Sequence, residues 1–306
     1  MVVCVHAMSA RPGIPHEILI NRIALLTRTS RRPCQSGPVW KEDAAISSAE
    51  LMRATDIWTS HVDSKTLVEI GQERRGPCVS MFRPIAGASG ENSRAMAALI
   101  EKAHNFLRQA GIGREVATAV LHPAEGLVEA DRVWTSGSHG IGVFASPDMF
   151  AVVLTGIPLA TQVVVSKRFV TRPLLPALED LTEFELRWAL AELAAHPGDD
   201  RVVTDLGKLL AAAPAGRVVE LYVDREARAW GCFDTATSLV ERVQAMAPIA
   251  DDLIDLAAVK TIASGGRVHV AECLEYGGES VPVLARVRSK SPATLPRGRR
   301  GRPDAT

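Results

Sequence analysis

Apolar and polar residues along the first half of the chain follow both helical and strand spacings. Between residues 91 and 110 apolar side chains recur at intervals of three and four, which predicts an amphipathic helix, and Gly111 stands where a C′ glycine would end it. An N-cap pattern at Ser48 predicts an earlier helix. Short apolar runs predict strands at 77–82, 140–145, 149–155 and 162–169. Helices and strands mix within one stretch, which indicates an α/β or mixed α+β fold.

The second half of the chain shows a more regular alternation of the same two spacings. A helix is predicted to open at Glu179–Thr182 and to stop at Pro197. Beyond it the pattern predicts two more helices, at 205–213 and 248–263, and three strands, at 217–223, 267–271 and 281–287. We therefore predict two domains, residues 51–178 and 179–288, hinged near 178–185, with no internal repeat.

Both ends of the chain differ in composition from these domains. Residues 1–50 are rich in Arg, Ser and Pro, and only 18–26 has the apolar density of a short helix, so we predict a poorly ordered basic extension. Two origins fit this extension: it is an organelle transit peptide, or the start codon has been assigned too far upstream and translation begins at Met52 or a nearby codon. Residues 289–306 are basic and rich in Pro and Gly, and we predict a disordered tail.

Charge is unevenly distributed along the chain although its formal sum is zero. Residues 1–41 carry +5 and residues 286–306 carry +6, so residues 42–285 carry −11. Attraction to nucleic acid would therefore come from the ends and not from the globular body.

The composition excludes several classes of protein. At 47% hydrophobic and 23% charged residues, the chain fits neither disorder along its whole length nor a coiled coil. The longest uncharged run, residues 149–166, is broken by Gly156 and Pro158, so no membrane span is expected. The N-terminus lacks the pattern of a secretory signal. Five scattered cysteines without a CxxC pair are typical of thiols in a reducing cytoplasm, rather than of a zinc site or disulfide framework, and we expect a cytoplasmic location.

Catalytic and cofactor motifs are missing from the sequence. Ser138 and His139 are adjacent, and neighbours on an extended backbone point apart, so we interpret the segment as a turn and not as part of a hydrolase triad. The sequence has no HExxH, GxGxxG or Walker motif. Gly265 and Gly266 fall between a predicted helix and strand, where a positive φ explains glycine without a ligand. We expect no enzyme activity and no cofactor.

Three aspartates cluster at Asp251, Asp252 and Asp255. Asp251 and Asp255 share a helix face at i,i+4 and would make a weak cation site. The favoured interpretation is a solvated helix N-terminus, where carboxylates are stabilised by the helix dipole.

Several segments, in order, resemble one protein family. They are residues 77–84, 140–144, 167–175, 216–224, 251–258, 265–268 and 282–288. Together they span about residues 60–288, and they are similar to bacterial relatives of the archaeo-eukaryotic peptide-chain release factors and their paralogue Pelota. The resemblance implies a release-factor-like N-terminal domain and a C-terminal domain with a ribosomal-protein-like α-β-α sandwich.

The resemblance also exposes a gap. Family members carry a middle domain, which in true release factors presents a Gly-Gly-Gln loop to the peptidyl-transferase centre. Here the segment ending at Pro176 runs within ten residues into the helix expected after that domain, and the sequence contains no Gly-Gly-Gln. The catalytic module is therefore expected to be absent.

Three functional hypotheses follow. The first is a non-catalytic, translation-associated protein that binds the ribosome or a translation GTPase, with RNA contact through basic residues near the C-terminus: Arg286, Arg288, Lys290, Arg297, Arg299, Arg300 and Arg302. The second is an enzyme or small-molecule binder with a site at the domain junction near Arg168, Arg172 and Glu179. The third is a degraded relative without function.

Overall fold

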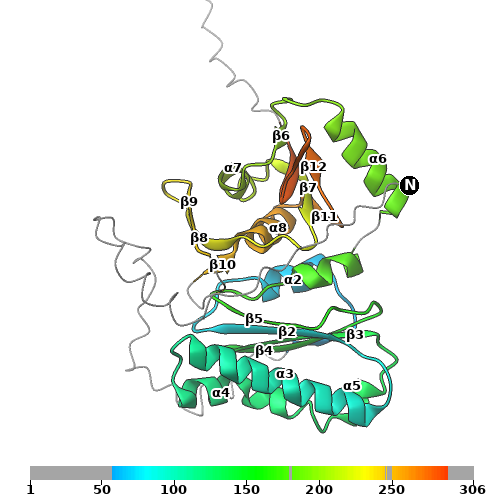
Figure 1. The fold of residues 1–306 in the computed structure, drawn as a ribbon, viewed down its shortest axis with the longest axis vertical. Coiled ribbons are helices and arrows are strands. Elements are labelled where there is room, and N and C mark those ends of the chain that lie inside the picture. Colours follow the sequence, from blue (N-terminus) through cyan, green and yellow to red (C-terminus); the bar gives the residue numbers. More distant parts are fainter. Residues whose placement is uncertain (1–56, 179–180, 245, 247–249, 289–306) are drawn as a thin grey trace, which may run out of the picture. The chain divides into compact units, whose positions relative to one another are not determined.

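The computed structural model describes residues 57–178, 181–244, 246 and 250–288, all of which belong to one compact unit, Trp40–Thr306. The predictions for residues 1–50, for the helix after Ser48 and for the tail 289–306 lie outside the described residues. The described part combines helices with several sheets, as the mixed α/β prediction required (Figure 1). No helix in it has the length and apolar content needed to cross a bilayer.

The first sheet has five strands in the order β1-β4-β3-β2-β5, antiparallel except for the β1–β4 pair. Its strands are β1 (Ile57–Thr59), β2 (Cys78–Pro84), β3 (Gly140–Ser146), β4 (Met149–Thr155) and β5 (Gln162–Ser166). The helices beside it are α2 (Ser64–Ile70), α3 (Ser89–Gln109), α4 (Arg114–Glu125) and α5 (Asp131–Trp134).

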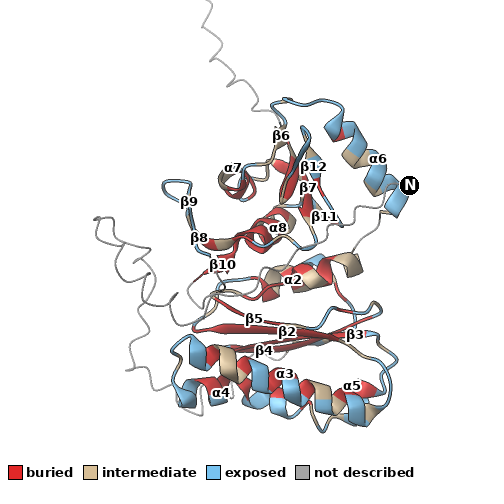
Figure 2. Ribbon diagram, in the orientation of Figure 1, coloured by how far each residue is buried: buried red, intermediate tan, exposed pale blue. Residues whose placement is uncertain are grey.

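Both faces of this sheet are buried (Figure 2). Met81, Val143 and Val152 lie in one apolar cluster with α3, α4 and α5. Phe82 and Phe144, on the opposite face, belong to a second cluster that includes α2. The rings of these two phenylalanines meet edge to face, with centroids 5.5 Å apart. Burial on both sides explains the nearly continuous apolar runs of β3 and β4.

The second half of the chain builds a four-stranded sheet in the order β11-β7-β14-β6. Its strands are β6 (Val202–Val203), β7 (Val218–Asp224), β11 (Arg267–Ala271) and β14 (Val283–Val287). Three helices accompany it: α6 (Glu183–Ala194), α7 (Leu206–Ala212) and α8 (Leu253–Ala263). Leu221 and Ala285 face α7 and α8, whereas Tyr222 and Leu284 share a cluster with Leu193 of α6. Helices thus lie on both faces of this sheet.

Two smaller sheets complete the described part. They are β10-β8-β9 and the hairpin β12-β13, made of β8 (Trp230–Asp234), β9 (Leu239–Arg242), β10 (Asp251–Asp252), β12 (Glu275–Tyr276) and β13 (Glu279–Ser280). A 3₁₀ segment, Arg172–Leu178, follows the loop after β5. The division into domains 51–178 and 179–288 stays a prediction. The largest apolar cluster contains side chains from both sides of that boundary, among them Phe144 and Leu221.

Several predicted helix ends match the structure and one does not. Gly111 and Gly265 follow α3 and α8 with φ of +78° and +80°, which confirms their role as C′ glycines. Thr182 caps α6 in a capping box with Glu185. The helix predicted at 248–263 begins only at Leu253, because Asp251 and Asp252 pair with β8 and Asp252 supplies the N-cap.

Candidate functional site

The loop after β5 and the beginning of α8 lie against each other, although about 80 residues separate them in the sequence. The backbone N–H of Lys167 donates to the carbonyl of Ala250 at 3.0 Å, which fixes the two segments side by side. From the loop come Arg168 and Arg172, and from the other segment come the three clustered aspartates. We define these residues, Arg168, Arg172, Asp251, Asp252 and Asp255, as the junction cluster.

The inner part of the junction cluster is an arginine held by two carboxylates. Nη2 of Arg172 lies 3.0 Å from Oδ2 of Asp252, and the two side chains are 3% and 0% exposed. Oδ1 of Asp255 accepts hydrogen bonds from the backbone N–H groups of Arg172 at 2.6 Å and Thr171 at 2.8 Å. The Thr171 hydroxyl donates to the same oxygen at 3.2 Å. Asp255 therefore anchors the backbone of the loop, and Asp252 anchors the side chain of Arg172.

The outer part of the cluster is nearer to solvent. Arg168 pairs with two carboxylates: its Nε lies 3.4 Å from Oδ2 of Asp251, and its Nη2 lies 2.9 Å from Oε2 of Glu73. Lys167 pairs with the other oxygen of Glu73 at 3.4 Å. Glu73 lies beyond the C-terminal end of α2, so a third segment of the chain joins the same charge network.

Burial is the largest influence on the pKa values of Asp255 and Asp251. It raises the pKa of Asp255 to about 7, with the neighbouring Asp252 charge acting in the same direction. Burial also raises the pKa of Asp251, against the opposing effect of Arg168. The charge of Arg168 lowers the pKa of the more exposed Glu73. Asp251 and Asp255 are thus the carboxyls of the cluster for which burial disfavours the charged state.

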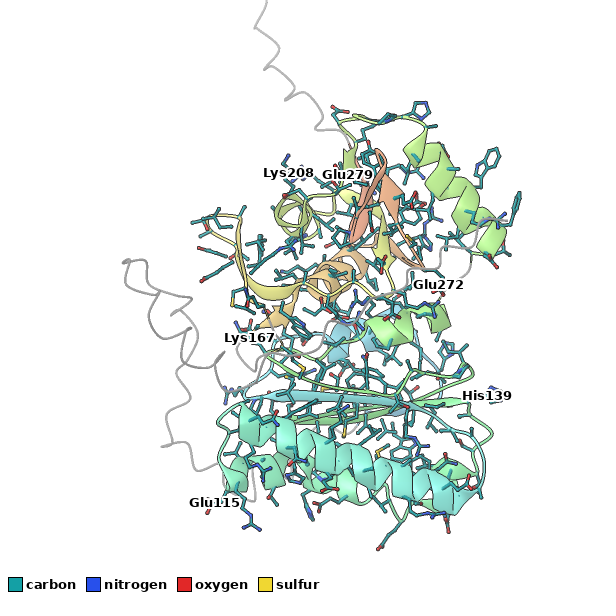
Figure 3. The ribbon with its side chains drawn as sticks, viewed as in Figure 1. Glu115, His139, Lys167, Lys208, Glu272 and Glu279 are labelled. Atoms are coloured by element: carbon teal, nitrogen blue, oxygen red, sulfur yellow. The ribbon has the colours of Figure 1, made fainter. Side chains whose placement is uncertain are left out.

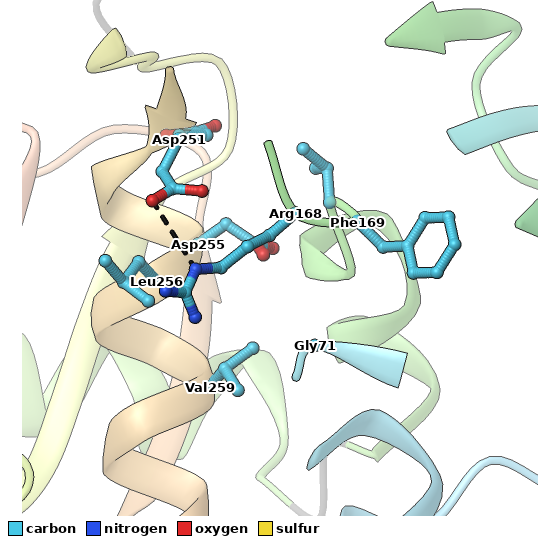
Figure 4. A pocket seen from close by; sticks show the side chains of 9 residues that line it. Gly71, Arg168, Phe169, Asp251, Asp255, Leu256 and Val259 are labelled. Atoms are coloured by element: carbon cyan, nitrogen blue, oxygen red, sulfur yellow. Dashed lines mark ion pairs between the residues drawn. The ribbon is translucent and has the colours of Figure 1, made fainter. Parts of the chain in front are cut away.

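A crevice opens between these segments (Figure 4). Its volume of about 10 Å³ is close to what one water molecule needs. Oδ1 of Asp251, which lines the crevice, has no hydrogen-bond partner among the described residues and would suit such a water. A Cβ added to Gly71 on the opposite wall would lie 2.6 Å from a methyl of Val259, so the packing there is already tight. The crevice has no room for a metabolite-sized ligand.

The structure brings together two of the three residues predicted for the junction. Arg168 and Arg172 pair with consecutive aspartates, Asp251 and Asp252, while Glu179 lies outside the described residues. The expectation of a solvated helix N-terminus at the aspartates is wrong: Asp251, Asp252 and Asp255 are 6%, 3% and 4% exposed. Their carboxylates contact the arginines and the loop backbone of the other segment. The described residues contain no group of side chains suited to hold a metal ion.

The basic residues predicted to contact RNA are divided by the structure. Arg286, on β14, is paired with Glu220 of β7 through Nε at 3.0 Å and through Nη2. Arg288 is exposed just beyond β14, and its backbone N–H donates to Arg217. The other five, Lys290, Arg297, Arg299, Arg300 and Arg302, lie outside the described residues. Arg286 therefore has a structural partner that competes with any phosphate.

Glu220 is a buried charge that the sequence analysis missed. It is 5% exposed and is held by Arg267 and Arg286 from the two neighbouring strands. The Tyr222 hydroxyl donates to it at 3.3 Å, and burial together with the Glu220 charge raises the pKa of Tyr222 to about 12. A single acid in the apolar strand 217–223 was the available signal, because a charge is rarely buried without a partner.

The Ser138-His139 pair forms a turn, as predicted. Gly137 has a φ of +78°, and His139 is exposed just before β3, the middle strand of the first sheet, with Nδ1 donating to the Gly156 carbonyl at 2.8 Å (Figure 3).

Comparisons of the chain with models of protein families and with curated proteins find no match.

Proposed function

We propose that this chain is a non-catalytic, translation-associated binding protein of the cytoplasm, related to the release factor and Pelota family but without the middle domain. Its expected partner is the ribosome or a translation GTPase. The proposal depends first on the ordered resemblance of seven segments, and on the absence of Gly-Gly-Gln from the sequence.

The observation that carries the proposal is the direct contact between two of those segments. Residues 167–175 come from the segment that would precede the middle domain, and residues 251–258 come from the C-terminal domain. Arg172 is buried against Asp252, and Asp255 holds the backbone of Thr171 and Arg172. Removing one partner of such a buried pair leaves an uncompensated charge, so the contact is sensitive to any rearrangement. This supports a protein in which the two outer modules are joined without a module between them.

The same geometry argues against the alternative of a small-molecule site at the junction. The crevice holds about one water, and the arginines that would bind an anionic ligand are already paired with carboxylates. A binding function would then use the outer surfaces or the basic ends. The −11 charge of residues 42–285 disfavours ribosomal RNA as the partner of the body itself.

Co-sedimentation tests the proposal. Tagged full-length protein in a cell lysate should travel with ribosomal particles in a sucrose gradient at about 0.1 M salt. The matched control is a variant in which Lys290 is changed to Arg and Arg297, Arg299, Arg300 and Arg302 to Lys, which keeps every charge of the tail and should sediment like the natural chain. Protein found only at the top of the gradient, with the ribosome profile intact, would show that the ribosome is not its partner.

A further inference from the structure

Helix α6 has two large aromatic side chains on its outer face. Its inner face is packed, since Leu186, Leu190 and Leu193 lie against the cluster around Tyr222. On the opposite side Phe184 and Trp188 are 69% and 68% exposed. Neither takes part in a contact between rings within the described residues. Phe184 and Trp188 are one helical turn apart and so form a contiguous apolar patch, and such patches, unlike single exposed apolar residues, commonly mark interaction surfaces.

The outer face has the spacing of a coiled-coil seam. Phe184, Trp188, Ala191 and Ala195 follow one another at intervals of four, three and four, and all four are exposed. These are d, a, d and a positions of a heptad, the positions that face a partner helix. We call these four residues the α6 seam. The small side chains at its C-terminal half let a second helix approach closely there.

Charged residues flank the seam in a self-complementary way. Glu185 and Glu192 occupy e positions, and Arg187 occupies a g position; all three are exposed. Among the described residues neither Arg187 nor Glu192 has an ion-pair partner at contact distance, although the charge of Glu192 contributes, after the closer Glu220, to the raised pKa of Arg286. In a parallel pair of identical helices a g residue faces the e residue five positions later on the partner, so Arg187 would face Glu192 of a second copy, twice. An antiparallel pair would instead place glutamate against glutamate.

We propose that the α6 seam binds a second copy of this chain, as a parallel pair of α6 helices. Trp188 and Phe184 would each pack against the same residue of the second copy, and two Arg187–Glu192 pairs would set the orientation. This proposal is independent of the translation-related one. A 12-residue helix is about 18 Å long, and a standard interface buries about 800 Å² per partner, so the dimer should be weak and concentration-dependent.

Sedimentation velocity between 2 and 200 µM tests the pairing. The natural chain should pass from monomer toward dimer over this range, and Phe184→Ala/Trp188→Ala should stay monomeric. The matched control is Leu239→Ala, because Leu239 on β9 is 67% exposed but lies off the seam. Circular dichroism confirms that each variant folds. A natural chain that is monomeric throughout, or a dimer that survives loss of both aromatic groups, would overturn the proposal.

Charge exchange and cross-linking test the orientation. Arg187→Glu and Glu192→Arg should each weaken the dimer by about tenfold, and the double variant should restore it, because opposite charges face each other again. Ala191→Cys should give a covalent dimer under oxidising conditions, since the two copies of residue 191 adjoin in a parallel pair. Ala194→Cys, on the flank, and the natural chain with exposed Cys273 are the controls. Failure of the double exchange to rescue, or cross-linking no stronger than in the controls, would overturn the parallel arrangement.

Discussion

Arg172 and Asp252 form a fully buried ion pair, with Nη2 and Oδ2 3.0 Å apart, between two segments 80 residues apart in the sequence. A buried pair of this kind adds little net stability over apolar side chains of the same volume, because both charges lose their hydration. Its loss is costly in another way, since removal of Arg172 would leave the buried carboxylate of Asp252 with only the more distant Nε of Arg228, 3.9 Å away, as a cationic partner.

The first prediction follows from this asymmetry. Arg172→Met should lower the free energy of unfolding by about 3–5 kcal/mol. Adding Asp252→Asn, which keeps an N-cap residue on α8, should recover part of that loss, so the double variant is more stable than the sum of the single effects predicts. Urea denaturation of the four proteins measures this coupling. Arg201→Met, which breaks an exposed pair with Asp199, is the control and should leave the midpoint almost unchanged. Strict additivity would contradict the prediction.

The second prediction concerns pH. The pKa of Asp255 is raised to about 7 in the folded protein, from about 3.9 in an unfolded chain. Between about pH 4 and 7 the folded state therefore holds a proton that the unfolded state has released, so this group makes the free energy of unfolding fall as pH rises, and level off above that window. Relative to Asp255→Asn, the natural chain should lose stability from pH 5 to 7, by at most about 1.4 kcal/mol per pH unit.

Urea denaturation at pH 5, 6, 7 and 8 measures this difference. Glu73→Gln is the matched control. Because Arg168 lowers the pKa of Glu73, the contribution of Glu73 to the free energy of unfolding is lost only as pH falls below about 4. The difference in the free energy of unfolding between Glu73→Gln and the natural chain should therefore be constant from pH 5 to 8. Parallel profiles for the natural chain and Asp255→Asn would contradict the prediction.

Local patterns were enough to predict much of this fold. The helix α3, its C′ glycine and the start of α6 just after Thr182 depend on residues within a few positions of one another. The two central strands β3 and β4 were found at nearly their full lengths because continuous burial leaves an apolar run. The short strands β6, β12 and β13 carry too few residues for any period to show.

The chemistry of the junction was harder to predict, because its partners are distant in the sequence. Asp251 and Asp255 have the spacing of an ordinary exposed helix start, and only the position of Arg168 and Arg172 explains why they are buried. The same is true of Glu220, whose partners come from the two strands beside it. Sequence indicates that such charges are present, whereas the tertiary fold decides which of them meet.

The third prediction tests a close contact at the start of β3. A Cβ added to Gly140 would lie 2.5 Å from the Ile157 carbonyl oxygen and 2.6 Å from the Thr155 hydroxyl. Gly140→Ala should therefore lower stability by about 1–3 kcal/mol through overpacking. Gly90→Ala is the control: nothing lies within 4 Å of its added Cβ, and in the first turn of α3 it should stabilise by about 0.5–1 kcal/mol. Thermal unfolding gives both values, and equal effects at the two positions would show that the contact does not limit substitution.

The fourth prediction is chemical. Hydrolysis of peptidyl-tRNA requires groups that position water in the peptidyl-transferase centre, and the sequence has no Gly-Gly-Gln loop to supply them. Purified ribosome complexes carrying a labelled peptide should release no more of it with this protein than without. A bona fide release factor in the same assay provides the positive control. Release above background would contradict the proposed absence of a catalytic module.

The last prediction separates the two kinds of basic residue near the C-terminus. Five basic residues come after β14 in the sequence: Lys290, Arg297, Arg299, Arg300 and Arg302. If they contact the phosphates of an RNA, each contact releases counterions. The logarithm of the affinity should then fall with the logarithm of the salt concentration, with a slope of about −0.7 per contact on single strands. Deleting residues 289–306 should therefore flatten the salt dependence of binding to single-stranded RNA by several units and leave the unfolding midpoint unchanged. Arg286→Ala should do the opposite: because this arginine is committed to buried Glu220, its loss should lower the midpoint and leave the slope nearly the same. Filter binding at 50–300 mM salt, with thermal unfolding of both variants, makes the comparison. An unchanged slope after the deletion would move the binding surface to the acidic body and favour a protein partner over RNA.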